Sequence, residues 1–176
     1  MTIEVYSKKD NKIKITFPTK KNGSAVAILI QHCPPLDLNS TYHYLIQSYY
    51  FNQTCSVAFD GEKIVAFVSG FIKPTNKNCL FIWQVAIHED YRGKGLGIEL
   101  IEFLLNQNKE VNTIETTITK NNIASRRMFQ KIVEKYEARM SEEALFDKEK
   151  DFSNEHDSEM LITIGPIKIK VKNENI

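Results

Sequence analysis

The stretch CLFIWQVAIHEDYRGKGLGIELIEFLLNQN, residues 79–108, decides the fold of this chain. Its first part, residues 79–87, is a run of apolar and aromatic residues that predicts a buried strand. Its last part predicts an amphipathic helix, because Leu96, Leu100 and Leu104 recur at helical spacing on one face. The glycine loop between them therefore opens a helix directly after a strand.

The glycine loop, residues 92–97, presents backbone N–H groups at a helix N-terminus, where such groups attract phosphate. Glycines let the backbone approach an anion closely, and Arg92 and Lys94 add positive charge. From the residues alone, a tight strand-to-helix turn with solvated basic side chains fits equally well. Two standard phosphate loops do not match: Gly95 stands where a P-loop needs Ser or Thr, and alternating glycines differ from G-x-G-x-x-G.

Strand signals lie upstream of this stretch. Apolar alternation predicts a strand over residues 12–17, and the polar residues 1–11 before it are expected to be frayed. Two β-prone runs, 54–59 and 63–72, flank the dipeptide Asp60-Gly61. That dipeptide is a strong hairpin signal, so we expect two antiparallel strands there.

Three further helices are expected. An apolar run after Ser24, a plausible N-cap, predicts a short helix that Pro34 and Pro35 end. A second helix follows a cap at Asn39 or Ser40, and a later one follows Asn122.

Downstream, residues 113–119 and 159–165 predict strands, so the order is mixed α and β. Residues 141–158 between the last elements hold many charges and are expected to form a mobile, partly acidic excursion. In the basic tail after residue 166, apolar and basic residues alternate. This pattern fits an edge strand or no ordered structure.

Length and charge exclude several classes of protein. A chain of 176 residues fits one domain, which we place at 12–167, with flexible ends at 1–11 and 168–176. The net charge of +1 provides no broad field for nucleic acid or an anionic membrane surface. No apolar run approaches the ~18 residues that cross a bilayer.

The positions of the cysteines and histidines argue against disulfide bonds and a metal site. Three cysteines spread along the chain fit neither a disulfide framework nor paired zinc ligands: Cys33, Cys55 and Cys79. Three of the histidines have no ligand-like spacing: His32, His43 and His88. We therefore expect a cytoplasmic protein without a metal site.

The glycine loop resembles the acyl-CoA-binding signature of the GNAT acetyltransferases, which is Arg or Gln, two residues, Gly, one residue, then Gly or Ala. Here these positions are Arg92, Gly95 and Gly97. The resemblance extends through WQVAIHEDYRG before the loop and NNIASRRMF after it, over most of residues 54–135. It implies the GNAT fold, an α/β (α+β) arrangement with a mixed, mostly antiparallel central sheet flanked by helices. It also implies a V-shaped splay between the strands around 80–87 and 113–119.

The same resemblance implies acetyl-CoA as co-substrate and indicates where it binds. The strand backbone at Val85 and Ile87 would pair with pantetheine, and Asn122 is a further implied contact. The implied loop contacts are Arg92, Gly93, Lys94, Gly95, Leu96 and Gly97. Two positions depart from many members: Phe129 replaces the tyrosine that protonates the leaving thiolate, and Gln84 supplies no strand carboxylate. The thiolate is then expected to take its proton from water, from the substrate or from another tyrosine.

Four blocks across residues 34–88, PPLDLNSTYHYL, QTCSVAFD, FVSGFIKP and LFIWQVAI, resemble one branch of this family. That branch acetylates the 4-amino group of L-2,4-diaminobutyrate on the way to the osmolyte ectoine. The resemblance implies that Asp37 and Tyr42 hold the α-ammonium group and that Trp83 forms a wall of the site. It also implies that Glu159 binds ammonium and that Glu159 or His156 relays its proton. A homodimer is expected by the same resemblance.

Other interpretations remain open from the residues alone. Asp37 fits a turn after Pro35, Trp83 fits core packing, and the two residues near 156–159 fit a solvated acidic loop. Two rival functions also remain: a GNAT enzyme for another small diamine or amino acid, and a non-catalytic acyl-CoA-binding module. The absence of a tyrosine at position 129 is the best argument for the binding module.

Overall fold

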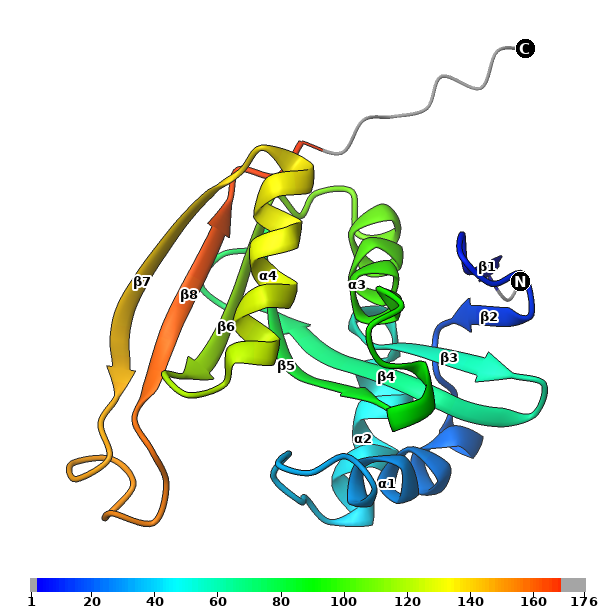
Figure 1. The fold of residues 1–176 in the computed structure, drawn as a ribbon, viewed down its shortest axis with the longest axis horizontal. Coiled ribbons are helices and arrows are strands. Elements are labelled where there is room, and N and C mark those ends of the chain that lie inside the picture. Colours follow the sequence, from blue (N-terminus) through cyan, green and yellow to red (C-terminus); the bar gives the residue numbers. More distant parts are fainter. Residues whose placement is uncertain (1–2, 169–176) are drawn as a thin grey trace.

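A computed structural model of the chain describes residues 3–168, and the basic tail from 169 onward lies outside the described residues. Within the described residues, eight strands form one sheet in the order β1-β2-β3-β4-β5-β6-β8-β7 (Figure 1). Only the β5–β6 pair is parallel among these neighbours. The mixed, mostly antiparallel sheet is therefore confirmed. The strands are β1 (Glu4–Tyr6), β2 (Ile13–Thr16), β3 (Ser56–Asp60), β4 (Lys63–Ile72), β5 (Cys79–Ile87), β6 (Thr113–Thr119), β7 (Arg139–Phe146) and β8 (Glu159–Gly165).

Helices cover both faces of the sheet (Figure 1). The α-helices are α1 (Gly23–Gln31), α2 (Thr41–Tyr50), α3 (Leu96–Gln107) and α4 (Ile123–Tyr136). Short 3-10 turns lie at Lys20–Asn22, Asn52–Thr54 and Glu89–Tyr91. Local signals explain most boundaries: Ser40 Oγ caps α2 by accepting from the His43 N–H, and Asn122 caps α4 by accepting from the Ser125 N–H. The cap expected at Ser24 is wrong, because α1 begins at Gly23 as a continuation of the preceding 3-10 turn.

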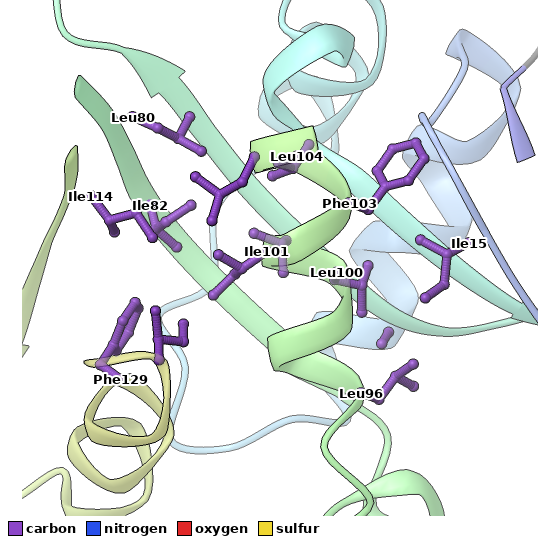
Figure 2. Packing of buried hydrophobic residues seen from close by; sticks show 14 of the residues in the cluster. Ile15, Leu80, Ile82, Leu96, Leu100, Ile101, Phe103, Leu104, Ile114 and Phe129 are labelled. Carbon is purple, nitrogen blue, oxygen red and sulfur yellow. The ribbon is translucent and has the colours of Figure 1, made fainter. Parts of the chain in front are cut away.

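The larger core lies between the sheet and the α3–α4 layer (Figure 2). Leu100, Ile101 and Leu104 of α3 are fully buried there, in the same cluster as Leu80 and Ile82 of β5 (Figure 2). Burying each such side chain contributes roughly 1.5–3 kcal/mol. The amphipathic pattern after the glycine loop therefore becomes the face that holds α3 on the sheet.

The predicted splay between β5 and β6 is present. The two strands pair from Cys79 to Ile82, and β5 then continues from Trp83 to Ile87 without pairing to β6. The β4–β5 ladder shifts register at the same height, so that Ser69 faces Gln84 and Gly70 faces Ile82. Trp83 therefore has no partner on β4, and this bulge turns β5 away from β6.

Two expectations about exposed segments are wrong. Residues expected to be frayed include β1, which pairs with β2, and the excursion expected from residue 141 begins with β7, which pairs with β8. All side chains of both strands are exposed, so neither strand shows the apolar alternation that reveals a half-buried strand. Backbone pairing at the two sheet edges holds these segments. The rest of the excursion, residues 147–158, is an ordered loop with hydrogen bonds such as Lys148 N–H to Ser158 Oγ at 2.9 Å.

Candidate active site

The glycine loop connects β5 to α3 and is lined with free backbone donors. Among residues 3–168, no protein acceptor faces the N–H groups of residues 93–97. Gly93 and Gly95 have φ of 75° and 83°, a region that favours glycine and that turns successive N–H groups toward one side. Arg92 Nε donates to the Ile87 carbonyl at 3.0 Å and ties the loop to β5. The loop is therefore a nest for an anion at the start of α3.

Little space lies behind the loop at Gly97. A Cβ on Gly97 would lie 2.8 Å from Met128 Sδ and 3.1 Å from Ile87 Cδ1, so these side chains would have to move to admit it. The loop, the splayed end of β5 and α4 therefore converge at this point. A pyrophosphate on the nest and an extended pantetheine along β5 fit this arrangement, so Arg92, Gly93, Lys94, Gly95, Leu96 and Gly97, with Val85 and Ile87, are the residues that would hold acetyl-CoA.

An acidic cluster lies near the splayed end of the sheet. His156 Nε2 lies 3.5 Å from Asp37 Oδ2 and 3.8 Å from Glu159 Oε1, so three residues predicted from the sequence meet. The Glu159 side chain is 16% exposed, and its buried Oε2 has no hydrogen-bond partner among the described residues. Burial raises the pKa of Glu159. A half-buried carboxylate with a free oxygen can bind an ammonium group and accept its proton.

His156 has its pKa raised, chiefly by its hydrogen bond to the Asp157 carbonyl, at 2.7 Å from Nδ1, and also by the nearby Asp37 and Glu159 carboxylates. The raised pKa favours the charged ring, which bridges two acidic residues from distant segments. Such a bridge joins the loop before α2 to the loop before β8.

Aromatic side chains lie next to this cluster. Trp83 is 49% exposed, so core packing does not describe it. Its ring meets the His43 ring edge-on, with centroids 4.9 Å apart, and the Phe71 ring with centroids 6.4 Å apart. Burial lowers the pKa of His43, which favours the neutral ring. No sequence pattern predicted His43 at this place, because its ring meets Trp83 only through the packing of α2 against β5.

Gln84 has a positioning role that the sequence analysis missed. Its Nε2 donates to the Asp37 carbonyl at 2.9 Å, and its Oε1 accepts from the Tyr44 hydroxyl at 3.3 Å. Both Gln84 and Tyr44 are buried. They therefore attach the Asp37 loop to β5. A polar side chain within the apolar run of β5 was the available signal.

Three other positions have plainer environments. Tyr42 is 71% exposed, and within residues 3–168 no hydrogen bond or ring contact joins it to Asp37 or His156. The Asn122 side chain is engaged as the cap of α4. Phe129 is buried in the core and offers no hydroxyl to a leaving group (Figure 2).

Residues 3–168 contain neither a metal-binding cluster nor a membrane-spanning helix. No group of three or more His, Cys, Asp or Glu side chains is arranged to hold a metal ion. No helix in that part of the chain has the length and apolar character to span a bilayer.

Comparison with known proteins agrees with the geometry. The model of the Acetyltransferase (GNAT) family matches residues 25–133. An L-2,4-diaminobutyric acid acetyltransferase of Methylotuvimicrobium alcaliphilum is 41% identical over 89% of this chain and 92% of its own length. The same enzyme of Vibrio cholerae is 42% identical over 84% of this chain and 86% of its own length.

Solved structures give the same result. Diaminobutyrate acetyltransferase from Paenibacillus lautus, solved with its substrate L-2,4-diaminobutyric acid and coenzyme A, superposes with a TM-score of 0.84 at 33% identity. The match covers 91% of this chain and 98% of that one. The ribosomal-protein-S18-alanine N-acetyltransferase of Escherichia coli shares the fold, with a TM-score of 0.64 at 15% identity over 93% of this chain and 99% of its own. The chain belongs to the GNAT family of acetyltransferases and, within it, to the L-2,4-diaminobutyric acid acetyltransferases.

Proposed function

We propose that this protein transfers the acetyl group of acetyl-CoA to the 4-amino group of L-2,4-diaminobutyrate, which gives N4-acetyl-L-2,4-diaminobutyrate for ectoine biosynthesis and growth at high salt. The relatives named above support the reaction. The observation that carries it is the cluster of Asp37, His156 and Glu159 near the splayed end of β5. A small molecule with two ammonium groups matches two carboxylates in one cluster.

Each residue of the site has a separate role in substrate binding or proton transfer. The Asp37 carboxylate binds the α-ammonium group, and the Trp83 ring covers the aliphatic part of the substrate. The Glu159 carboxylate accepts the proton of the 4-ammonium group, and His156, whose Nε2 lies 3.8 Å from Oε1, relays that proton onward after releasing its own ring proton to solvent. Bound acetyl-CoA supplies the thioester that the uncharged amine attacks.

The reaction is tested by incubating the protein with acetyl-CoA and each of diaminobutyrate, ornithine, lysine and spermidine. Thiol release measures turnover, and NMR of the product locates the acetyl group. We expect diaminobutyrate to give the highest kcat/KM, with acetylation at N4. Preference for another amine would reject the substrate, and no turnover with any amine would favour the binding module.

Replacing Asp37 with alanine should raise the KM for diaminobutyrate by about ten- to hundredfold, because a charge-assisted contact to the α-ammonium group is lost. The KM for acetyl-CoA should change less than twofold. Steady-state kinetics with each substrate varied in turn measures both constants. Asp157→Ala is the matched control, since that exposed carboxylate lies on the same loop as His156 and pairs with Lys148. Equal losses for both substrates would instead indicate a folding defect.

We also propose that the protein is a homodimer. The end of α2 and the residue after it expose Tyr49, Tyr50 and Phe51 by 56%, 72% and 43%. Adjacent exposed aromatic residues of this kind are typical of interfaces. Sedimentation velocity at micromolar concentration should give twice the chain mass, and Tyr50→Glu should shift it toward the single-chain mass. A single-chain mass for the unmodified protein would refute the dimer.

We place the protein in the cytoplasm. The three cysteines are buried and free, which suits a reducing compartment. Cell fractionation with an antibody would reject this location if the protein were recovered outside the cytosolic fraction.

A further inference from the structure

The turn between β1 and β2 reaches the glycine loop, although the two are more than eighty residues apart in the chain. Lys9 lies on this turn, and its Nζ is 2.9 Å from the point where a Cβ on Gly95 would stand. Its Cε is 3.6 Å from the same point. The ammonium group of Lys9 therefore lies directly against the backbone at the start of α3.

The turn is held in this position by its own hydrogen bonds. Ser7 is buried, and its Oγ accepts from the N–H groups of Lys9 at 3.2 Å and Asp10 at 3.3 Å. The Lys8 N–H donates to Glu99 of α3 at 3.3 Å. These contacts attach the turn to α3, the helix whose N-terminus lies next to Lys9. The position of Lys9 beside Gly95 is therefore held by hydrogen bonds of the turn backbone.

Electrostatics alone does not favour this placement. A helix N-terminus has a partial positive charge, so an ammonium group beside it is repelled. Among residues 3–168, Lys9 forms no ion pair with a carboxylate, whereas its neighbour Lys8 pairs with Glu102 at 3.3 Å. The N–H groups of residues 93–97 also lack acceptors there. An anion between Lys9 and these donors removes the repulsion and satisfies both sides.

We propose that Lys9 is a binding residue for the pyrophosphate of acetyl-CoA, reaching it from the N-terminal hairpin. The proposal rests on the proposed function, which places the pyrophosphate at the glycine loop. The other basic residues of the loop leave room for this role: Arg92 Nε is engaged with the Ile87 carbonyl, and Lys94 Nζ lies 5.2 Å above the Tyr91 ring. Lys9 is the basic side chain that stands against Gly95 itself.

The test compares Lys9→Ala with Lys12→Ala by titrating the complete protein with coenzyme A in a calorimeter. Lys12 lies on the same turn and is exposed, so its removal changes the net charge equally without touching the loop. We expect Lys9→Ala to weaken binding about tenfold and Lys12→Ala to change it less than twofold. Lys9→Arg should restore most of the affinity.

Shorter ligands identify the group that Lys9 contacts. The tenfold loss should persist with 3′-dephospho-CoA, which keeps the pyrophosphate, and disappear with pantetheine, which lacks it. Equal affinities for the two variants would overturn the proposal, and loss of the effect with 3′-dephospho-CoA would overturn the assignment to pyrophosphate. Failure of the unmodified protein to acetylate diaminobutyrate would reject only the substrate, because these titrations need no amine.

Discussion

Replacing Glu159 with glutamine should lower kcat for diaminobutyrate by about 10²–10³-fold, the usual range for loss of a general base. Glutamine keeps the size of the side chain and can still contact an ammonium group, but it accepts no proton. The KM for acetyl-CoA should be nearly unchanged, because the glycine loop does not involve this residue. Steady-state kinetics at saturating acetyl-CoA measures the effect. Glu155→Gln, an exposed position on the same loop, is the control.

The dependence of kcat on pH tests the role of Glu159 independently. Burial raises the pKa of Glu159, and only the deprotonated form can accept a proton, so kcat should fall as the pH drops through this raised pKa. That acid limb should be absent from the residual activity of Glu159→Gln. A variant that keeps half of kcat, or keeps the acid limb, would show that another group is the base.

Stability should move in the opposite direction from activity. Because the pKa of Glu159 is higher in the folded state than in the unfolded chain, its stabilising contribution is full at low pH and is lost as the pH rises through the folded pKa. At pH 7 the buried carboxylate therefore costs folding free energy. Glutamine carries no charge there, so we expect Glu159→Gln to have a Tm at or above that of the unmodified protein. The loss of kcat then cannot be attributed to unfolding.

The sequence predicted those parts of the fold that bury a regular apolar pattern. The amphipathic residues of α3 and the alternation in β6 gave those elements, and the Asp60-Gly61 turn gave the β3–β4 hairpin. The strands β1 and β7 were missed because their side chains are exposed, and backbone pairing with a few surface ion pairs, such as Arg126 with Glu142, holds them. Apolar periodicity records burial, so it misses a strand that buries no side chain.

The residues of the candidate site also fall into those that the sequence predicted and those that it missed. The glycine loop is contiguous, so its residues alone suggested an anion site or a plain strand-to-helix turn, and the resemblance to the GNAT signature decided between the two. The contact between Asp37 and His156 joins residues far apart in the chain, and the resemblance to a known branch, rather than any local pattern, brought them together. Gln84 and His43 were missed because their roles depend on the packing of α2 and the Asp37 loop against β5.

Replacing Gly70 with alanine should lower the free energy of unfolding by about 2–4 kcal/mol, among the largest losses that one methyl group can cause. A Cβ at this position would stand 2.5 Å from the Phe81 carbonyl oxygen and 3.2 Å from the Thr54 carbonyl oxygen. Both obstacles are backbone atoms, so no side-chain rotation can relieve them. The strand β5 must shift away from β4 or the ladder must break.

Thermal unfolding measures the effect, with a Tm decrease of roughly 5–15 °C expected for a chain of this size. Gly61→Ala is the control: Gly61 lies at the β3–β4 turn with φ of 59°, and nothing stands within 4 Å of a Cβ there, so its cost is only about 1–2 kcal/mol of backbone strain. Equal Tm values for the two variants would contradict the close approach at Gly70.

The position of Gly70 links this loss of stability to the active site. Gly70 pairs with Ile82 just beyond the register shift that leaves Trp83 without a partner on β4. Any displacement of Phe81 and Ile82 therefore moves Trp83 and the start of the splay as well. Gly70→Ala should consequently lose kcat/KM for diaminobutyrate even below its own Tm, whereas Glu159→Gln loses kcat with its stability intact. The two variants together separate the chemistry of the site from the bulge that shapes it.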